Sequence, residues 1–245
     1  MTEKYCGPEK IIEKKKNYLI PCVYHFYKNP PQIVRGEMQY LYDHQGRKYL
    51  DFYSGVAVVN AGHCNPEITA RTCRQITTLQ HTTTIYLTQP LVDLAEKIAA
   101  LTPADLCKSF FCNSGSEANE GALLLARLYT DRTGFVSLSH SLHGRTYMTM
   151  SLTGIPMWRT ENMLSKDVIF IPSPYCFRCQ LNLDYPACDL ACARELEKAI
   201  TGRGPSEVAA FITEPVEGNG GIIVPPPDYF SVIRDITKNN PAAAQ

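Results

Sequence analysis

The chain has 245 residues, of which 44% are hydrophobic and 20% charged, so it can form a packed core and does not have the composition of a disordered protein. Lysine plus arginine and aspartate plus glutamate both number 24, and this zero net charge gives no electrostatic reason to expect nucleic acid as a partner. No apolar run reaches the roughly 18 residues that a membrane-spanning helix needs, so we expect no membrane partner.

The first 33 residues are basic, aromatic and proline-containing, which indicates an arm rather than part of a core. They contain no apolar stretch of the kind found in secretory signals. They also carry glutamates, which are uncommon in mitochondrial transit peptides. We therefore expect a cytoplasmic location.

Three further elements are predicted before residue 108. Residues 40–60 predict a β-hairpin, because short β-rich runs flank the turn Asp43–Gly46. A helix is predicted after the loop that follows, with Asn65 as its N-cap and Pro66 at its first position. Residues 90–101 have apolar residues at helical spacing and predict another helix.

From residue 108 onward, predicted strands alternate with predicted helices. A short buried strand is expected at 108–113, followed directly by a helix at 116–130. The further elements are strands at 133–140, 167–173 and 208–216 and helices at 191–200 and 227–238. Such alternation favours an α/β fold with a mostly parallel sheet.

The junction "NSGSEANE" between the strand at 108–113 and its helix favours anion binding. The first amide N–H groups of a helix have no acceptor within the helix, and the helix dipole is positive at that end. Gly115 has no side chain to keep an anion away, and the hydroxyl of Ser116 adds a donor, so the junction suits a phosphate group. The structural alternative is that Ser114 or Ser116 only caps the helix.

Four segments, in the same order, resemble class III pyridoxal phosphate-dependent aminotransferases, the group that contains alanine–glyoxylate, 4-aminobutyrate and ornithine aminotransferases. They are "YLYDHQGRKYLDFYSGVAVVNAGHCNPEI", "NSGSEANE", "HGRT" and "EPVEGNGG", and the likeness runs from about residue 18 to about residue 236. The resemblance implies the large domain of fold-type I transferases, with a mostly parallel sheet and helices on both faces. It implies an N-terminal arm and small-domain segment over 1–70 and an incomplete pyridoxal phosphate-binding domain over 71–245.

The resemblance also implies roles for individual residues in binding the cofactor. Gly115 and Ser116 match the pair that holds its phosphate. Leu142 takes the position of an aromatic residue that usually stacks on the pyridine ring, so it would pack on the ring face by dispersion alone. His143, which follows it, could compensate for the lost stacking or could be an ordinary loop histidine. Glu214 matches a glutamate in the polar shell of the site, with a solvated strand-end carboxylate as the alternative.

Two residues are expected at the substrate by the same resemblance. Arg145 matches an arginine that holds the substrate carboxylate, and guanidinium and carboxylate groups form bidentate pairs of fixed orientation. Val56 stands where the ornithine enzyme has a tyrosine, and Asn219 stands where a second glutamate is usual. Both favour a small amino donor such as alanine, β-alanine or 4-aminobutyrate, with an oxo acid as acceptor. The resemblance itself implies a homodimer for the full-length family. For Arg145 and Val56 the alternatives are a surface arginine and a core valine.

The lysine that forms the Schiff base with the cofactor and the aspartate at the pyridine nitrogen have no match in this chain. In the family both follow the helix that begins at "PDYFSVIRD", and Lys238 is the last lysine present. We therefore expect a C-terminally truncated piece of an aminotransferase that does not transfer amino groups by itself. The alternatives are a non-catalytic homologue that binds a full-length subunit, and another pyridoxal phosphate enzyme such as a decarboxylase or lyase.

Four of the ten cysteines cluster in "CFRCQLNLDYPACDLAC". The pairs Cys176 with Cys179 and Cys188 with Cys192 have spacings that allow them to bind one tetrahedral zinc ion. The segment between the pairs is shorter than in common zinc fingers. This favours the alternative, a loop of reduced thiols packed against the large domain.

Overall fold

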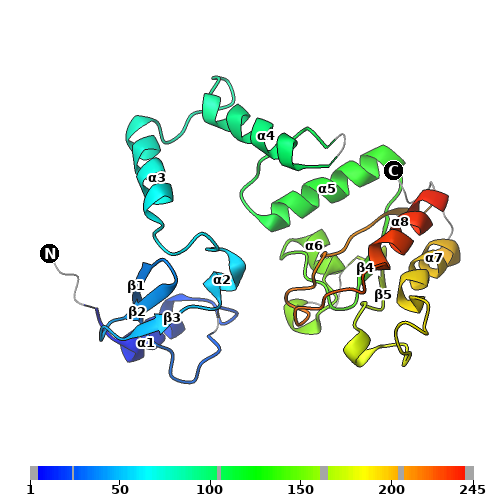
Figure 1. The fold of residues 1–245 in the computed structure, drawn as a ribbon, viewed down its shortest axis with the longest axis horizontal. Coiled ribbons are helices and arrows are strands. Elements are labelled where there is room, and N and C mark those ends of the chain that lie inside the picture. Colours follow the sequence, from blue (N-terminus) through cyan, green and yellow to red (C-terminus); the bar gives the residue numbers. More distant parts are fainter. Residues whose placement is uncertain (1–4, 24, 104–105, 161–164, 204–206, 241–245) are drawn as a thin grey trace. The chain divides into compact units, whose positions relative to one another are not determined.

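The computed structural model describes residues 5–23, 25–103, 106–160, 165–203 and 207–240 (Figure 1). The chain divides into two compact units, Met1–Asp93 and Leu94–Gln245. Helix α4 (Gln89–Leu101) carries the chain from one unit into the other and confirms the helix predicted at 90–101. The domain boundary expected near residue 70 stays a prediction.

The first unit contains a small antiparallel sheet. Its strands are β1 (Ile33–Glu37), β2 (Tyr40–Asp43) and β3 (Lys48–Leu50), and the hairpin predicted for this region is formed by β2 and β3. Helix α1 (Pro8–Tyr18) precedes the sheet, was not predicted, and buries none of its residues.

A buried carboxylate closes the hairpin turn. Asp43 is 2% exposed, and its oxygens accept hydrogen bonds from the Gln45 and Arg47 amides (both 2.9 Å), Arg47 Nε (2.7 Å) and Tyr49 Oη (2.8 Å). Burial opposes ionisation, but the hydrogen bonds from Tyr49 and Arg47 outweigh it and hold the pKa of Asp43 below its usual range. The turn is therefore fixed by an ionised side chain and not only by turn propensity.

Two short elements connect this sheet to α4. The turn α2 (Ser54–Ala57) has φ between 50° and 62° at all four residues, so it is left-handed, a conformation that costs residues other than glycine about 1–2 kcal/mol each. Helix α3 (Pro66–Thr78) begins as predicted, because Asn65 Oδ1 accepts the amide N–H of Glu67 (3.0 Å) and of Ile68 (3.4 Å).

The second unit is built on a parallel sheet of three strands, as predicted. β4 (Gly134–Leu138) lies between β5 (Val168–Ile171) and β6 (Val208–Phe211). Successive side chains of β4 point to opposite faces of the sheet. Phe135 packs with residues of α5 (Gly115–Thr130) and α6 (Tyr147–Leu152), whereas Val136 and Leu138 pack with residues of α7 (Ala191–Arg203) and α8 (Tyr229–Asn239). The result is an α/β fold with helices on both faces.

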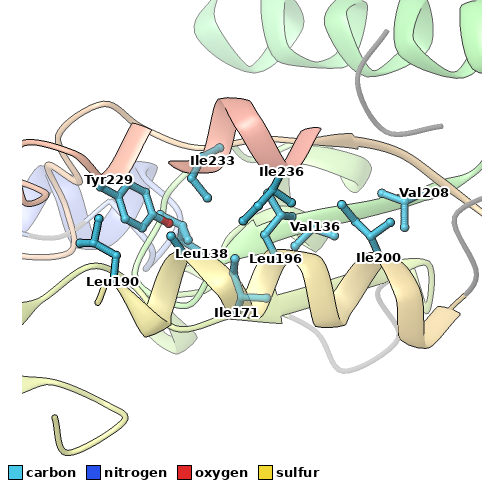
Figure 2. Close-up of a cluster of buried hydrophobic side chains, with 11 residues drawn as sticks. Val136, Leu138, Ile171, Leu190, Leu196, Ile200, Val208, Tyr229, Ile233 and Ile236 are labelled. Atoms are coloured by element: carbon cyan, nitrogen blue, oxygen red, sulfur yellow. The ribbon is translucent and has the colours of Figure 1, made fainter. Parts of the chain in front are cut away.

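The larger core lies on the α7 and α8 face. Figure 2 shows its side chains gathered between these helices and the sheet. The buried members are Val136, Leu138, Ile171, Leu190, Ala193, Leu196, Ile200, Val208, Tyr229, Ile233 and Ile236. Within the described residues, no helix is long and apolar enough to cross a membrane.

The prediction of a strand at 108–113 is wrong. This segment has no regular secondary structure, and Phe110 is 89% exposed. A strand must pair its backbone N–H and C=O groups with a neighbouring strand. The sheet of the second unit consists of β4, β5 and β6 in the described part of the chain, so the apolar run at 108–113 has no strand beside it.

Candidate functional site

The predicted site residues of the second unit lie on loops at one edge of the parallel sheet and at the start of α5. Strand β4 leads into the loop 139–146, β5 into the segment after residue 171, and β6 into the loop 212–221. The carboxyl ends of parallel strands share one edge, and ligands of open α/β sheets bind outside that edge. Hydrogen bonds between these loops and α5 define the geometry of the site.

The first turn of α5 has two amide groups free for a ligand. Ser114 Oγ accepts the amide N–H of Glu117 (3.2 Å), and the Glu117 carboxylate accepts the amide N–H of Asn113 (2.8 Å). Ser114 is therefore the N-cap of α5, and this cap leaves two amides of the first turn unused. Over the described residues, the amides of Gly115 and Ser116 have no acceptor. A Cβ atom built on Gly115 would meet nothing within 4 Å, so the space beside these amides is open.

Ser116 ties the loop after β4 to the start of α5. Its Oγ accepts the amide N–H of Arg145 at 3.1 Å. This approach depends on Gly144, which has φ 144°, since a Cβ atom there would overlap Ser116 Oγ and lie 2.6 Å from Thr149 Oγ1. The loop is thus seated on the helix turn that carries the open amides.

Two residues that the sequence reasoning missed strengthen this contact. Asn119 Nδ2 donates to the carbonyl oxygen of His143 (2.7 Å), and Glu120 Oε1 accepts the amide N–H of Met148 (3.0 Å). Both belong to the segment "NSGSEANE", one helical turn after Gly115 and Ser116. They lie on the same face of the helix as Gly115 and Ser116, so helical spacing was the signal that could have identified them.

His143 is buried, and one of its ring nitrogens has no partner. The residue is 5% exposed, and its backbone amide donates to Thr153 Oγ1 (3.1 Å). Burial lowers the pKa of the imidazole to about 4, so the ring is neutral at neutral pH. Nε2 is buried and has no hydrogen-bond partner within the described structure.

Glu214 joins the loops that follow β4 and β6. One carboxylate oxygen accepts the amide N–H of Leu142 (2.7 Å), and the other accepts that of Gly218 (3.0 Å). Both oxygens are therefore engaged with the backbone. Glu214 holds Leu142 in place, and this arrangement differs from the solvated strand-end carboxylate of the alternative.

Glu217, which the sequence reasoning did not single out, is fully buried three residues later. Its Oε1 accepts a hydrogen bond from Ser173 Oγ (2.8 Å), while Oε2 has no partner in the described part of the chain. Burial raises the pKa of Glu217 to about 7, and the nearby charge of Glu214 adds to this rise. Ser173 Oγ also accepts the amide N–H of His140 (3.0 Å), so Ser173 connects the segments after all three strands.

The two predicted substrate residues lie in different units. Arg145 is exposed in the loop after β4, and its guanidinium carbon lies 4.9 Å from the centroid of the Trp158 ring. This is a cation–π arrangement. Val56 belongs to the left-handed turn of the first unit, where it is 61% exposed with φ 62°. Its φ and exposure do not fit the core valine of the alternative.

The clustered cysteines are reduced thiols, as the favoured alternative predicted, and do not support the zinc site that their spacing allowed. Cys176, Cys179, Cys188 and Cys192 are free thiols that line a cavity of about 10 Å³ together with apolar side chains. A structural zinc site needs its sulfur atoms about 2.3 Å from one point. Throughout the ranges that the structure describes, no group of three or more His, Cys, Asp or Glu side chains is placed to hold a metal ion.

Comparison with known proteins gives a consistent result. A family model described as "Aminotransferase class-III" matches residues 25–243. Alanine–glyoxylate aminotransferase 2 homolog 2, mitochondrial, of Arabidopsis thaliana is 39% identical over 236 residues, which are 96% of this chain and 48% of that protein. Acetylornithine aminotransferase of Methanocaldococcus jannaschii is 36% identical over 234 residues, which are 93% of this chain and 52% of that protein.

Solved structures agree with the sequence relatives. The (S)-enantioselective omega-transaminase of Thermomicrobium roseum superposes with a TM-score of 0.87 at 28% identity, over 98% of this chain and 56% of that chain. The present chain therefore spans about half the length of the curated relatives it matches.

Proposed function

Because the chain belongs to the class III aminotransferases, we propose that it carries the phosphate-binding half of an enzyme that moves an amino group from a small amino acid to an oxo acid with pyridoxal phosphate. The observation that supports this most directly is the open space beside the free amides of Gly115 and Ser116. These amides, at the positive end of a helix of 16 residues, suit the phosphate dianion of the cofactor.

The other residues of the site fit the remainder of the cofactor. Leu142, held by Glu214, would lie against the ring face, where its contact is dispersion alone. Neutral His143 offers Nε2 to a polar atom of the ligand. Bound pyridoxal phosphate supplies an electron sink for the bonds at the amino-acid α-carbon.

Arg145 is the residue proposed to orient the substrate. Its guanidinium can form two parallel hydrogen bonds to a carboxylate, which fixes the direction of the rest of the amino acid. Its place over Trp158 supports a preformed position for the charge. The names of the relatives include alanine, glyoxylate and acetylornithine, and we favour a small donor of the alanine, β-alanine or 4-aminobutyrate type. The substrate contact expected of Val56 stays a prediction.

We propose that this chain alone does not complete the transfer. This rests on the family resemblance, by which none of its lysines is expected at the position of the covalent link to the cofactor. The test is an assay with L-alanine, an oxo acid and added cofactor, in which formation of pyruvate is measured. Turnover by the purified chain would contradict the proposal, as would a visible absorbance band of a lysine-bound cofactor that borohydride abolishes.

Cofactor binding can be tested separately from turnover. We expect pyridoxal phosphate to bind more tightly than pyridoxal, which lacks the phosphate, and inorganic phosphate to compete with it. The variant Gly115→Ala places a methyl group in the open space without meeting a neighbouring atom, so it should fold and lose about tenfold or more in affinity. Gly121→Ala, on the same helix and also without a neighbour within 4 Å, is the matched control and should bind normally. Equal affinity of the two variants for pyridoxal phosphate would contradict phosphate binding at Gly115 and Ser116.

A second subunit is the partner we propose. Four apolar residues of α5 are 56–72% exposed: Leu124, Leu125, Leu128 and Tyr129. An apolar helix face of this kind is typical of an interface. Sedimentation of the chain alone and with a full-length homologue distinguishes a homodimer from a mixed pair. A monomer in both samples would contradict the proposed partner.

The cytoplasmic location stays a prediction, since the Arabidopsis relative is described as mitochondrial.

A further inference from the structure

The loop between β5 and α7 brings four thiols to one cavity. Cys176 begins the short 3-10 helix η2 (Cys176–Arg178), which Cys179 follows directly. Cys188 lies twelve positions beyond Cys176 and precedes α7, and Cys192 lies sixteen positions beyond Cys176 as the second residue of that helix. All four side chains line the cavity of about 10 Å³, and none forms a disulfide. Two arms of one loop therefore present a pair of cysteines each to a shared space.

The thiols that line this cavity also affect one another's ionisation. The pKa of Cys176 is raised by burial and then by the neighbouring thiolates of Cys188 and Cys179. Burial raises the pKa of Cys192 to about 11, and the other three cysteines add to this. These shifts accord with the shared cavity that all four side chains line.

We propose that this cluster is a reversible dithiol–disulfide site in which Cys176 bonds to Cys188 when a peroxide oxidises the protein. Cys176 is the exposed member of the four, and Cys188 is half-buried and lines the same cavity. The Cys176 thiolate attacks one peroxide oxygen, so that a sulfenic acid forms and hydroxide leaves. The Cys188 thiolate then attacks that sulfur, the S–S bond forms and a second hydroxide leaves. With the two thiol protons, one hydrogen peroxide yields two waters.

The oxidised loop would act on the segments that follow β4 and β5. Gln180 directly follows Cys179, and its Oε1 accepts hydrogen bonds from Ser139 Oγ (2.7 Å) and from the amide N–H of Ser173 (3.0 Å). Ser173 in turn bonds Glu217 and the His140 amide. A cross-link in the cysteine loop therefore restrains residues at the carboxyl edge of the sheet. The inference stands independently of the proposed amino-group transfer.

The test is oxidation of the reduced full chain with hydrogen peroxide, followed by thiol titration and a non-reducing tryptic peptide map. Trypsin cuts after Arg178 and so separates Cys176 from the other three cysteines. We expect the free thiols to fall from ten to eight, a new species joining the two tryptic peptides through Cys176 and Cys188, and full recovery with dithiothreitol. The reaction should be faster above neutral pH, because the pKa of Cys176 is raised.

Matched variants sharpen the result. Cys176→Ser and Cys188→Ser should each abolish the linked species, whereas Cys73→Ser, which removes an exposed cysteine of α3, should leave it unchanged. Should a serine variant fail to fold, further cleavage of the linked wild-type peptides before Asp184 and Asp189 separates Cys179, Cys188 and Cys192 and shows which of them is bonded to Cys176. Oxidation to sulfinic acids without a cross-link, random pairs between chains, or thiols masked by a stoichiometric metal ion would each overturn the proposal.

Discussion

The buried carboxyl group of Glu217 makes the stability of the second unit depend on pH. In the unfolded chain this glutamate ionises near its ordinary pKa of 4.5, whereas in the folded protein burial raises that pKa to about 7. Stability from this group is therefore fully present below pH 4.5 and is lost as the pH rises through 7. At roughly 1.4 kcal/mol for each tenfold change in proton affinity, the loss is about 3 kcal/mol.

The variant Glu217→Gln isolates this effect, because glutamine cannot ionise and can still accept the hydrogen bond of Ser173. Urea unfolding is followed by the fluorescence of Trp158, the single tryptophan of the chain, which lies in the same unit. We expect the free energy of unfolding of the wild type, minus that of the variant, to fall by about 3 kcal/mol between pH 4.5 and pH 8.

The control is Glu197→Gln, an exposed glutamate on α7 of the same unit, for which the difference should stay flat across this range. Besides Ser173, the charge of Glu214 acts on Glu217, and Glu217 in turn acts on Tyr229. Both couplings require the Glu217 charge, so they are absent from the glutamine variant and are part of the expected difference. Parallel pH profiles for wild type and Glu217→Gln would refute the reasoning.

Three further predictions follow from contacts described above. Gly144→Ala should lower the free energy of unfolding by about 2 kcal/mol or more and weaken pyridoxal phosphate binding, since the added methyl group meets Ser116 and Thr149. An unchanged melting temperature and unchanged binding would contradict the close approach of Gly144 to these two side chains. Asn65→Ala should cost about 1 kcal/mol of helix stability, measured by circular dichroism with Asn65→Asp as the control that keeps the cap; equal loss in both would exclude capping as the cause. Asp43→Asn should lower the melting temperature of the first unit. It should also reduce the loss of stability in acid, because the lowered pKa of Asp43 makes folding favour the ionised form. An unaltered acid transition would count against the stabilising role of the Asp43 hydrogen bonds.

The sequence predicted best what is determined locally. Asn65 followed by Pro66 fixed the start of α3, and the parallel sheet followed from strands that alternate with helices. The strand prediction at 108–113 was wrong because an apolar segment forms a strand only where a neighbouring strand can pair with it, whatever its own composition. The left-handed turn at α2 was missed for the related reason that Ser54, Val56 and Ala57 have no intrinsic preference for positive φ.

The motifs of the candidate site could be predicted from the sequence, but the hydrogen bonds that join its loops could not. Gly115 and Ser116 were identified from residue types at a helix start. The roles of Asn119, Ser173 and Glu217 depend on side chains that meet across 24 to 44 positions of sequence, and no local pattern indicates such contacts. The cysteine spacing suggested a metal, whereas the structure places the thiols around a cavity lined by apolar side chains as well.

The seating of Gly144 on the first turn of α5 also restricts how this region can evolve. A side chain at position 144 meets not only Ser116 Oγ but also Ser116 Cβ (2.9 Å) and Thr149 Oγ1 (2.6 Å). Shortening Ser116 alone would still leave Thr149 in the way, so accommodating a larger residue requires at least three coordinated substitutions. Each intermediate would carry a clash or a lost hydrogen bond, and single-step variation at these positions should be strongly selected against. The loop after β4 and the helix turn beneath it are therefore expected to be inherited as one block, even where the rest of α5 diverges.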